Sequence, residues 1–504
     1  MARPQDTLAD GLRAVKSLQD AGRVAIRSQD LKRDQREALL RGGYIQRVIK
    51  GWYVPARPDE QPGESTAWYA SFWDFCASYL DYRFGEEWTL SPEQSALLYG
   101  GSTSVPQQLL VRSPKASNNT TELVHGTSIL EVKGELPAAI EREAVDGLRQ
   151  YTLAGALISS GPRIYRQNPI DMRAALGLLQ DASQVLPVLL EGGHTTAAGR
   201  LAGAVRSIGR DRIADNILKA MRAAGYTVNE SNPFEDDVSI ELPRREHSPY
   251  VNRMHGFWQS MRTEIIEIFS GPPGITEDAA TYLKTVEDAY TTDAYHSLSI
   301  EGYRVTEELI ERVRSGSWNP DQVKADLQQR DAMAARGYWL AFQEVKESVA
   351  RVLAGENPGD VSDSDHSGWF VALFTPSVEA GILERADLAG YRNDQVYIRN
   401  SMHTPPKSEE VLDCMAALFD LLREEEHAAV RTVMGHWLFG YIHPYMDGNG
   451  RIGRFLMNVL LASGGYPWTV ITIDRRDEYM AALEEASVKN NIKPLAEFLA
   501  SLLP

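Results

Sequence analysis

The segment His443–Arg454 gathers side chains that could hold a phosphate group. Its sequence, HPYMDGNGRIGR, places two glycines around an asparagine, between two stretches with apolar residues at helical spacing. Glycines permit positive φ angles, so successive backbone N–H groups can converge on an anion. The start of the following helix adds its positive dipole end and its unsatisfied N–H donors. We therefore interpret this loop as an anion-binding nest.

Four side chains could add chemistry to the nest. Arg451 and Arg454 are three residues apart on the second helix, so both can reach the mouth of the loop. Asp447 is a hard oxygen ligand suited to a Mg²⁺ ion that bridges phosphates. His443 can accept a proton from an attacking hydroxyl near neutral pH. Because the chain contains no GxxxxGK[ST] sequence, we exclude a P-loop NTPase.

Each of these features has an ordinary structural explanation when taken alone. A GNG sequence is usually a turn, a histidine beside a helix is usually structural, and two arginines on one helical face are usually solvated. Their joint occurrence within twelve residues at the start of a helix favours a functional site.

HPYMDGNGRIGR closely resembles the Fic (filamentation induced by cAMP) signature HxFx[D/E]GNGRxxR, with Tyr445 in place of the usual phenylalanine. The resemblance extends over 251–504. It implies transfer of AMP from ATP to a protein hydroxyl, with Mg²⁺ held by Asp447 and His443 as the base. It also implies contacts with the triphosphate, from Gly448, Asn449, Gly450 and Arg451 to the phosphates and from Arg454 to the γ-phosphate. Homodimers are common in this family.

A second segment, SLSIEG at 297–302, matches the inhibitory-helix pattern [S/T]xxxE[G/N] of the same family. Ser297 and Glu301 are four residues apart and so lie on one helical face. The resemblance implies that Glu301 pairs with Arg454 and occupies the γ-phosphate position. The simpler alternative is a surface carboxylate that ends a helix at Gly302.

A third segment, QVYIRN at 395–400, alternates in the manner of a strand before Pro405 and Pro406. We expect a β-hairpin flap in this region. In the Fic family the corresponding hairpin holds the target protein's backbone as an added strand. The resemblance places that contact at Val396, Tyr397 and Ile398.

The elements that must position these residues predict a mainly α fold. We divide the chain into a winged-helix head at 1–60, a mixed α/β region at 61–228, a linker at 229–250 and a helical domain at 251–504. Apolar spacing predicts helices in the last domain at 253–270, 277–301, 306–315, 323–354, 409–424, 427–441, 450–463 and 477–487.

The head is basic, although the chain as a whole carries a net charge of −17. Residues 1–57 hold twelve Arg or Lys against six acidic residues. The order of elements is a helix at 8–18, a strand at 24–26, a brief helix from Ser28 to Arg33, a second helix ending at Gly42–Gly43 and a hairpin at 44–54. This order predicts a winged helix, in which the second of the paired helices enters the major groove and the hairpin touches the backbone.

The head and the region after it, over 8–225, resemble AbiEi-type antitoxins and transcriptional regulators in pattern. That resemblance implies DNA contacts from the recognition helix and the wing, which would be Arg33, Arg36, Arg41, Arg47 and Lys50. The alternative is a small protein-interaction domain with an ordinary charged surface.

Composition limits the setting of this protein. The sequence has no run of eighteen apolar residues and its first twenty residues contain no long apolar stretch, so we expect neither a membrane span nor a secretory signal. Cys76 and Cys414 have apolar neighbours, and we expect two buried reduced thiols. We therefore expect a cytoplasmic protein.

Three functions remain open from the sequence. The first is an autoinhibited adenylyltransferase that modifies Ser, Thr or Tyr hydroxyls, its own included. The second is the reverse reaction in the same pocket, with Glu301 positioning a water that removes AMP. The third is a DNA-binding regulator whose Fic domain senses nucleotide.

Overall fold

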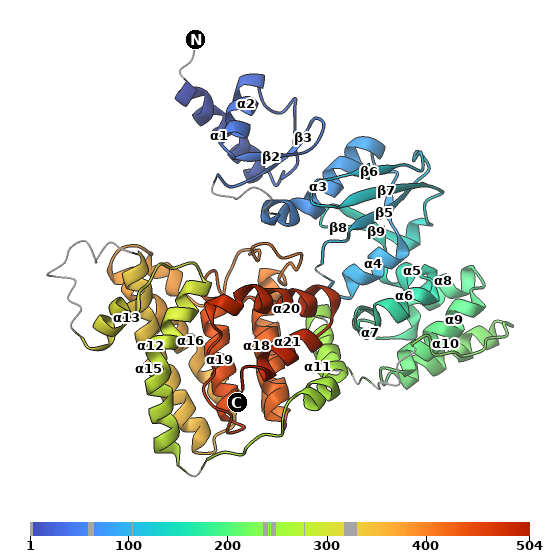
Figure 1. Ribbon diagram of the computed structural model, residues 1–504. Coiled ribbons are helices and arrows are strands. Elements are labelled where there is room, and N and C mark those ends of the chain that lie inside the picture. The colour runs from blue at the N-terminus through green and yellow to red at the C-terminus, as the bar shows by residue number, and fades with distance from the viewer. Residues whose placement is uncertain are drawn as a thin grey trace. The chain divides into compact units, whose positions relative to one another are not determined.

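The computed structural model describes residues 4–58, 65–102, 104–234, 240, 242, 248–276, 278–316 and 330–503. It forms two compact units (Figure 1). Unit 1 comprises Met1–Gly256 with Tyr397–Thr404, and unit 2 comprises Phe257–Val396 with Pro405–Pro504. The division falls within one helix, α11 (Pro249–Ile268). The four-part domain division stays a prediction.

Unit 1 contains α-helices of 6 to 19 residues and three small sheets. Its elements, in chain order, are α1 (Pro4–Asp20), β1 (Ile26–Arg27), α2 (Arg33–Arg41), β2 (Ile45–Ile49), β3 (Trp52–Pro55), α3 (Thr66–Phe84), β4 (Thr89–Leu90), α4 (Pro92–Tyr99), β5 (Gln108–Ser113), β6 (Thr120–Glu122), β7 (Ser128–Lys133), η1 (Ala139–Glu141), β8 (Arg142–Val145), β9 (Leu148–Tyr151), α5 (Leu153–Ser159), α6 (Pro162–Gln167), α7 (Pro169–Gly177), η2 (Ala182–Gln184), α8 (Leu186–Glu191), α9 (Thr195–Arg206) and α10 (Asp211–Ala223).

The first sheet has the order β1-β3-β2, all antiparallel, and α1 and α2 pack beside it. The hairpin expected at 44–54 is confirmed as β2 and β3. The brief helix expected from Ser28 is wrong, because this segment is a turn. Asp30 closes the turn by accepting from the N–H of Arg27 at 2.8 Å while its own N–H donates to the carbonyl of Arg27 at 2.9 Å. This local bonding competes with a helical start.

The hairpin and α3 share one hydrophobic core. Trp52 on β3 makes edge-on contacts with Phe75, Tyr79 and Tyr82 of α3, at ring-centroid distances of 5.5–5.9 Å. One face of the hairpin is therefore used for packing within unit 1. The remainder of unit 1 holds the sheet β4-β5-β7-β6, the pair β8-β9 and a helical cluster from α4 to α10.

The described elements of unit 2 are all helices, joined by loops. Its elements are the second half of α11, α12 (Ala279–Ile300), α13 (Glu307–Arg314), α15 (Arg330–Leu353), α16 (Pro358–Glu379), η3 (Arg385–Leu388), η4 (Ser408–Glu410), α17 (Val411–Glu424), α18 (Ala428–Ile442), α19 (Asn449–Ala462), η5 (Ile473–Arg475), α20 (Arg476–Lys489) and α21 (Lys493–Ala500).

The core of unit 2 is built around α18 and α19, which lie side by side with α15 and α16 next to α19 (Figure 1). In α18, thirteen residues are buried, and thirteen are buried in α19. These helices are buried on nearly all sides because neighbouring helices surround them. The loop between them is thus held at both ends by rigid elements.

The sequence pattern missed α16 and α21. The first turns of α16 are rich in Ser, Asp and Gly, which are weak helix formers. Asn357 caps this helix by accepting from the N–H of Gly359 at 2.8 Å, and Pro358 follows at the first helical position. Burial of Trp369 and Phe370 then stabilises the helix. Tertiary packing overrides the weak local preference.

The prediction of a β-hairpin flap within 390–410 is wrong, because the described residues of this segment form no β-strand. The segment is an extended loop without paired strands in its described residues, and a turn joins the N–H of Ser401 to the carbonyl of Ile398 at 3.1 Å. Pro405 and Pro406 have no N–H to donate to a partner strand. The side chain of Arg392 instead bonds the carbonyl of Pro406.

Other expectations concern membranes and thiols. Among the described helices, none combines the length and the apolar character needed to cross a membrane. Neither Cys76 nor Cys414 is in a disulfide, and both are fully buried, as expected.

Candidate active site

The loop between α18 and α19 has an unusual backbone at both ends. His443 ends α18 in the left-handed region, with φ 52° and ψ 61°. Gly448 starts α19 with φ 85°, and a Cβ there would lie 2.8 Å from Cε2 of Phe374. Both the angle and the space therefore require glycine at 448. The imidazole of His443 is held at a corner where few residues adopt this conformation.

Asn449 closes the loop with its side chain. Its Oδ1 accepts from the N–H of Tyr445 at 2.9 Å, and its Nδ2 donates to the carbonyl of Tyr445 at 2.8 Å. The side chain is buried. Both ends of the amide are thus used to fix the loop, so any contact of Asn449 with an anion comes from its backbone N–H.

The imidazole of His443 is neutral in this environment. Its Nδ1 lies 3.3 Å from the carbonyl oxygen of Gly440, which can only accept, so Nδ1 carries the proton and Nε2 keeps its lone pair. Removal from water lowers the pKa of His443 to about 4, and the bond to Gly440 opposes this only in part. The side chain is therefore uncharged at neutral pH.

Arg392 holds the corner that carries His443, and the sequence pattern did not single it out. Its backbone N–H donates to the carbonyl of Pro444 at 2.8 Å, and its Nε donates to the carbonyl of His443 at 2.9 Å. Its Nη2 also bonds the carbonyl of Pro406. The residue is 3% exposed. These carbonyls come from distant parts of the sequence, so no local pattern signals the role of Arg392.

Arg451 points its guanidinium between two aromatic rings. Its Cζ lies 5.1 Å from the ring centroid of Tyr303 and 5.0 Å from that of Phe374. Its Nη2 lies 3.3 Å from Oδ1 of Asp447, and its buried Nε has no acceptor among the described residues. The cation is thus fixed beside the loop with donor capacity to spare.

Arg454 bonds the helix α12. Its Nε donates to Oγ of Ser297 at 2.9 Å, and its Nη2 donates to the carbonyl of Ser297 at 3.0 Å and to Oε1 of Glu301 at 2.8 Å. The residue is 4% exposed, and its buried Nη1 has no acceptor among the described residues. The expected pairing of Glu301 with this arginine is present in the geometry, and Ser297 bonds the same guanidinium.

Glu301 lies against the nest. A Cβ added to Gly450 would collide with Oε1 of Glu301, so the carboxylate occupies the space beside the start of α19. Partial burial raises the pKa of Glu301. The charges of Arg454 and Arg451 lower it by a larger amount, so the pKa of Glu301 lies below its ordinary value. The side chain is 29% exposed. A charged oxygen therefore stands where an anion would be received, and a competing anion can reach it.

Asp293 extends the same face of α12 by one turn and was missed by the sequence pattern. It accepts from the hydroxyl of Tyr338 at 2.7 Å, and burial raises its pKa to about 6. Spacing of four joins Asp293, Ser297 and Glu301 into one stripe. That repeated spacing was the available signal.

Comparisons with known proteins agree with this geometry. Residues 375–461, which include the loop and α18, match the family model described as Fic/DOC family. This part of the chain is a Fic domain. The resemblance of HPYMDGNGRIGR to the Fic signature is thereby confirmed at the level of the family.

Curated relatives of the Fic domain carry one name. "Protein adenylyltransferase Fic" of Nematostella vectensis is 26% identical over 279 residues, which are 54% of this chain and 59% of that protein. The protein of the same name from Drosophila willistoni is 26% identical over 230 residues, 45% of this chain and 42% of that protein. The chain thus spans about half the length of the curated relatives that it matches.

A solved structure of Fic-1 from C. elegans is 18% identical and covers 64% of this chain and 89% of that chain, with a TM-score of 0.37. At that score the likeness carries no conclusion about the arrangement of the whole chain.

Asp447 of the Fic domain could bind Mg²⁺, but only as the single side-chain ligand from the described residues. Its side chain is 58% exposed, and Oδ1 accepts from the N–H of Gly448 at 2.6 Å. No cluster of three or more metal-binding side chains occurs among the residues described by the structure. Mg²⁺ commonly binds through one or two carboxylates together with waters and substrate phosphates, so the donor set suits a metal delivered with a triphosphate.

The boundary between the two units falls within the three flap candidates. Val396 is buried and counts with unit 2, whereas Tyr397, 39% exposed, and Ile398 count with unit 1. Their role in holding a target backbone stays a prediction.

The DNA candidates lie on the head of unit 1. Arg33 and Arg41 are exposed on α2, Arg47 is exposed on β2, and Lys50 is exposed in the turn that follows. Arg36 instead donates from Nη1 to the carbonyl of Ser28 at 2.8 Å and so braces the fold. DNA binding and the AbiEi resemblance stay predictions.

Tyr445 yields a first prediction, because the phenylalanine of the Fic signature lacks its hydroxyl. The ring is fully buried and stacks on Phe370 at 4.0 Å, as expected for an aromatic core residue, but the hydroxyl has no partner among the described residues. An unsatisfied buried donor costs about 1–3 kcal/mol. Tyr445→Phe should therefore raise the stability of the Fic domain by about 1 kcal/mol in calorimetry or urea unfolding.

A matched control is Tyr282→Phe, which removes a buried hydroxyl that donates to the carbonyl of Tyr466 at 2.7 Å. This variant should lose stability. A loss of stability in Tyr445→Phe equal to that of Tyr282→Phe would contradict the assignment of an unpartnered hydroxyl.

Proposed function

We propose that this protein is an autoinhibited protein adenylyltransferase, which transfers AMP from ATP to Ser, Thr or Tyr hydroxyls of a protein, its own included. One observation carries the proposal. A neutral imidazole with a free Nε2 stands next to a nest whose two arginines retain unpartnered buried donors. That set matches the needs of attack on a phosphate, namely a base, amide donors and cations. The names of the curated relatives support it.

The proposed reaction assigns one task to each residue. His443 Nε2 takes the proton from the target hydroxyl while that oxygen attacks the α-phosphorus of ATP. The bond from the α-phosphorus to the bridging oxygen of the β-phosphate breaks, and pyrophosphate leaves. The backbone N–H groups of Gly448, Asn449 and Gly450 with Arg451 hold the phosphate oxygens, and Arg454 holds the γ-phosphate. Mg²⁺, bound by Asp447, would neutralise charge on the phosphates.

Inhibition follows from competition for one cation. Arg454 already donates to Glu301, so a γ-phosphate must displace a charged carboxylate to reach the same guanidinium. ATP would then settle in a pose that leaves its α-phosphorus out of line with the attacking hydroxyl. Exposure of Glu301 makes displacement feasible.

The second candidate is removal of AMP in the same pocket. The charged carboxylate of Glu301 beside the nest favours this alternative, because it could orient a water toward an AMP-protein ester. Labelled ATP passing to protein distinguishes transfer from this reaction, which releases AMP from modified protein. A cytoplasmic site of action and a homodimer belong to the proposal as expectations.

The inhibitory role predicts that Glu301→Gly raises self-modification strongly, by at least about tenfold, since loss of the carboxylate frees a charge-assisted hydrogen bond for the γ-phosphate. Incorporation of label from ATP, with GTP, CTP and UTP in parallel, measures the change. Glu308→Gly removes an exposed acid from α13 and should leave the rate unchanged. Equal rates in Glu301→Gly and wild type would refute inhibition by this residue.

The base role predicts a different pattern for His443→Ala in the Glu301→Gly background. Transfer should fall to background, while the affinity for ATP, measured by calorimetry, stays within about twofold because the imidazole is needed only for chemistry. Residual transfer above a few per cent would show that another group takes the proton.

Arg392→Ala in the same background should lower kcat at least about tenfold with little change in KM for ATP, because it loosens the corner that aims His443. Arg385→Ala, an exposed arginine on η3, is the control. Melting curves separate misfolding from mispositioning. A rise in KM with unchanged kcat would mean that Arg392 serves nucleotide binding instead.

A further inference from the structure

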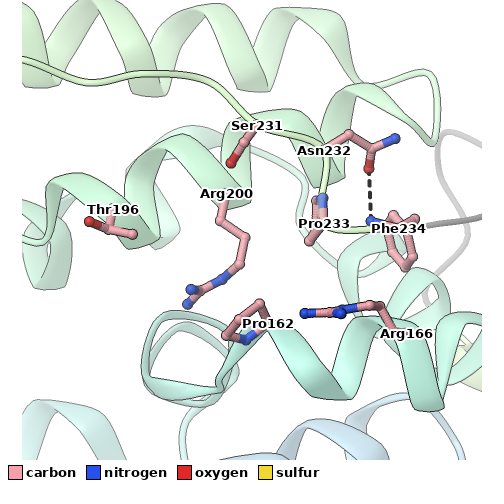
Figure 2. Close-up of a pocket in the computed structure, with 8 residues that line it drawn as sticks. All are labelled: Pro162, Arg166, Thr196, Arg200, Ser231, Asn232, Pro233 and Phe234. Carbon is pink, nitrogen blue, oxygen red and sulfur yellow. Dashed lines mark hydrogen bonds between the residues drawn. The ribbon is translucent and has the colours of Figure 1, made fainter.

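Unit 1 contains a cavity of about 370 Å³ between α6, α9 and the segment 231–234, which lies in the expected linker. Figure 2 shows its eight lining residues, Pro162, Arg166, Thr196, Arg200, Ser231, Asn232, Pro233 and Phe234. Both arginines have partners within the protein, since Nη2 of Arg200 donates to the carbonyl of Ser160 at 2.7 Å and Arg166 is also bonded. Neither cation of this cavity therefore calls for an outside anion.

Unit 2, in contrast, encloses a buried acid that the proposed reaction does not use. Asp293 on α12 is 4% exposed, and its Oδ2 accepts from the hydroxyl of Tyr338 on α15 at 2.7 Å. Burial raises the pKa of Asp293 to about 6, while the bond from Tyr338 and the charge of Arg454 limit the rise. The carboxyl group is thus mostly ionised at neutral pH and can then only accept hydrogen bonds. Buried carboxyl groups with a shifted pKa cluster at functional sites.

The helix α15 holds Tyr338 in a fixed place. A Cβ at Gly337, the preceding residue, would collide with the carbonyl oxygen of Leu373 on α16, so the two helices are in close contact. The ring of Tyr338 is fully buried and lies 4.8 Å from that of Phe455 on α19. Burial and the charge of Asp293 raise the pKa of Tyr338 well above its usual value. Its hydroxyl therefore keeps its proton and donates it to Asp293.

Ser297 joins Tyr338 to Arg454. The side chain of Ser297 hydrogen-bonds Tyr338, which opposes the rise in the pKa of that phenol in part. Its Oγ also accepts from Nε of Arg454 at 2.9 Å. A serine hydroxyl has one proton and a guanidinium has no acceptor, so Ser297 accepts from Arg454 and gives its proton to Tyr338. These contacts form one chain, from Arg454 through Ser297 and Tyr338 to Asp293.

Both ends of this chain allow one direction only. Arg454 can only donate and ionised Asp293 can only accept, so every proton between them points toward Asp293. Each hydrogen bond in such a chain strengthens the next. The oxygen of Ser297 consequently keeps a lone pair directed at Nε of Arg454, which fixes the plane of the guanidinium. Its Nη2 then stays directed at Glu301, 2.8 Å away.

We propose that Asp293 is a positioning residue, which acts through Tyr338 and Ser297 to hold Arg454 in the orientation that receives a γ-phosphate. The inference rests on the proposed function, because it assumes a triphosphate whose third phosphate takes the place of Glu301. An amide at 293 can present either a donor or an acceptor to Tyr338, so the direction of the chain is no longer imposed. Ser297 can then turn its proton toward Arg454, and the guanidinium loses a bond.

The test is calorimetric titration of the full chain with ATP and with ADP, in the Glu301→Gly background. Asp293→Asn should weaken ATP binding at least about fivefold and leave ADP binding within about twofold, because only the third phosphate needs the oriented guanidinium. Tyr338→Phe, which removes the middle link and keeps the ring, should have the same effect. The two substitutions together should weaken ATP binding no further than either alone, since they break one chain.

Tyr290→Phe is the matched control. Tyr290 on α12 is as fully buried as Tyr338, but its hydroxyl has no partner among the described residues. Its loss should leave both affinities within about twofold. Equal losses for ATP and ADP in Asp293→Asn would reduce Asp293 to general stability, and an unchanged ATP affinity would remove its role. Either result overturns the inference, and should Asp293→Asn fail to fold, Tyr338→Phe decides the question alone.

The same titrations separate this inference from the proposed function. Glu301→Gly without further change should favour ATP over ADP. If it does and Asp293→Asn keeps that preference, only the role of Asp293 is overturned. If Glu301→Gly shows no preference, the placement of the γ-phosphate on Arg454 fails, and the inference fails with it.

Discussion

A guanidinium taken out of water needs an anion close by, and Arg454 has one in Glu301 at 2.8 Å. The arginine is 4% exposed whereas the glutamate side chain is 29% exposed, so the cation is fixed and the anion is replaceable. We propose that this asymmetry makes the pair a phosphate receptor that the protein's own carboxylate occupies. The rest of the site depends on this arrangement. While Glu301 occupies the position beside Arg454, buried guanidinium nitrogens of Arg451 and Arg454 have no acceptor among the described residues.

The packing of unit 2 explains why such a site can persist. Burial of α18 and α19 fixes both ends of the loop, and the side chain of Asn449 ties its middle. Arg392 then pins the left-handed corner at His443. The chemistry is thus carried by backbone groups and charges whose positions are set by apolar helices, which is the usual basis of electrostatic preorganisation.

The sequence predicted the part of the site that is local. His443, Asp447 and Arg454 fall within one short segment, and spacing alone places Ser297 and Glu301 on one helical face. Arg392 could not be found this way, because its partners are carbonyls that come together only in the folded chain.

The same reason accounts for the errors in the fold. The helix α16 begins with residues that are weak helix formers and is stabilised by burial. The expected flap forms no strands, because Pro405 and Pro406 lack an N–H and Arg392 bonds the carbonyl of Pro406. The head has a local cause instead, because Asp30 bonds the backbone of Arg27 and forms a turn where a helix was expected. The sequence patterns predicted the structure correctly where local preference and tertiary packing agree. They failed where contacts distant in sequence decide and, at Asp30, where a side chain bonds the nearby backbone.

The central claim is that Glu301 holds the place of a γ-phosphate on Arg454. Comparing the affinities of ATP and ADP by calorimetry, in wild type and in Glu301→Gly, measures this directly. We expect wild type to bind the two nucleotides about equally, and Glu301→Gly to favour ATP by about tenfold or more, since only then does the third phosphate gain a charge-assisted bond. The same ATP-to-ADP ratio in both proteins would contradict the account.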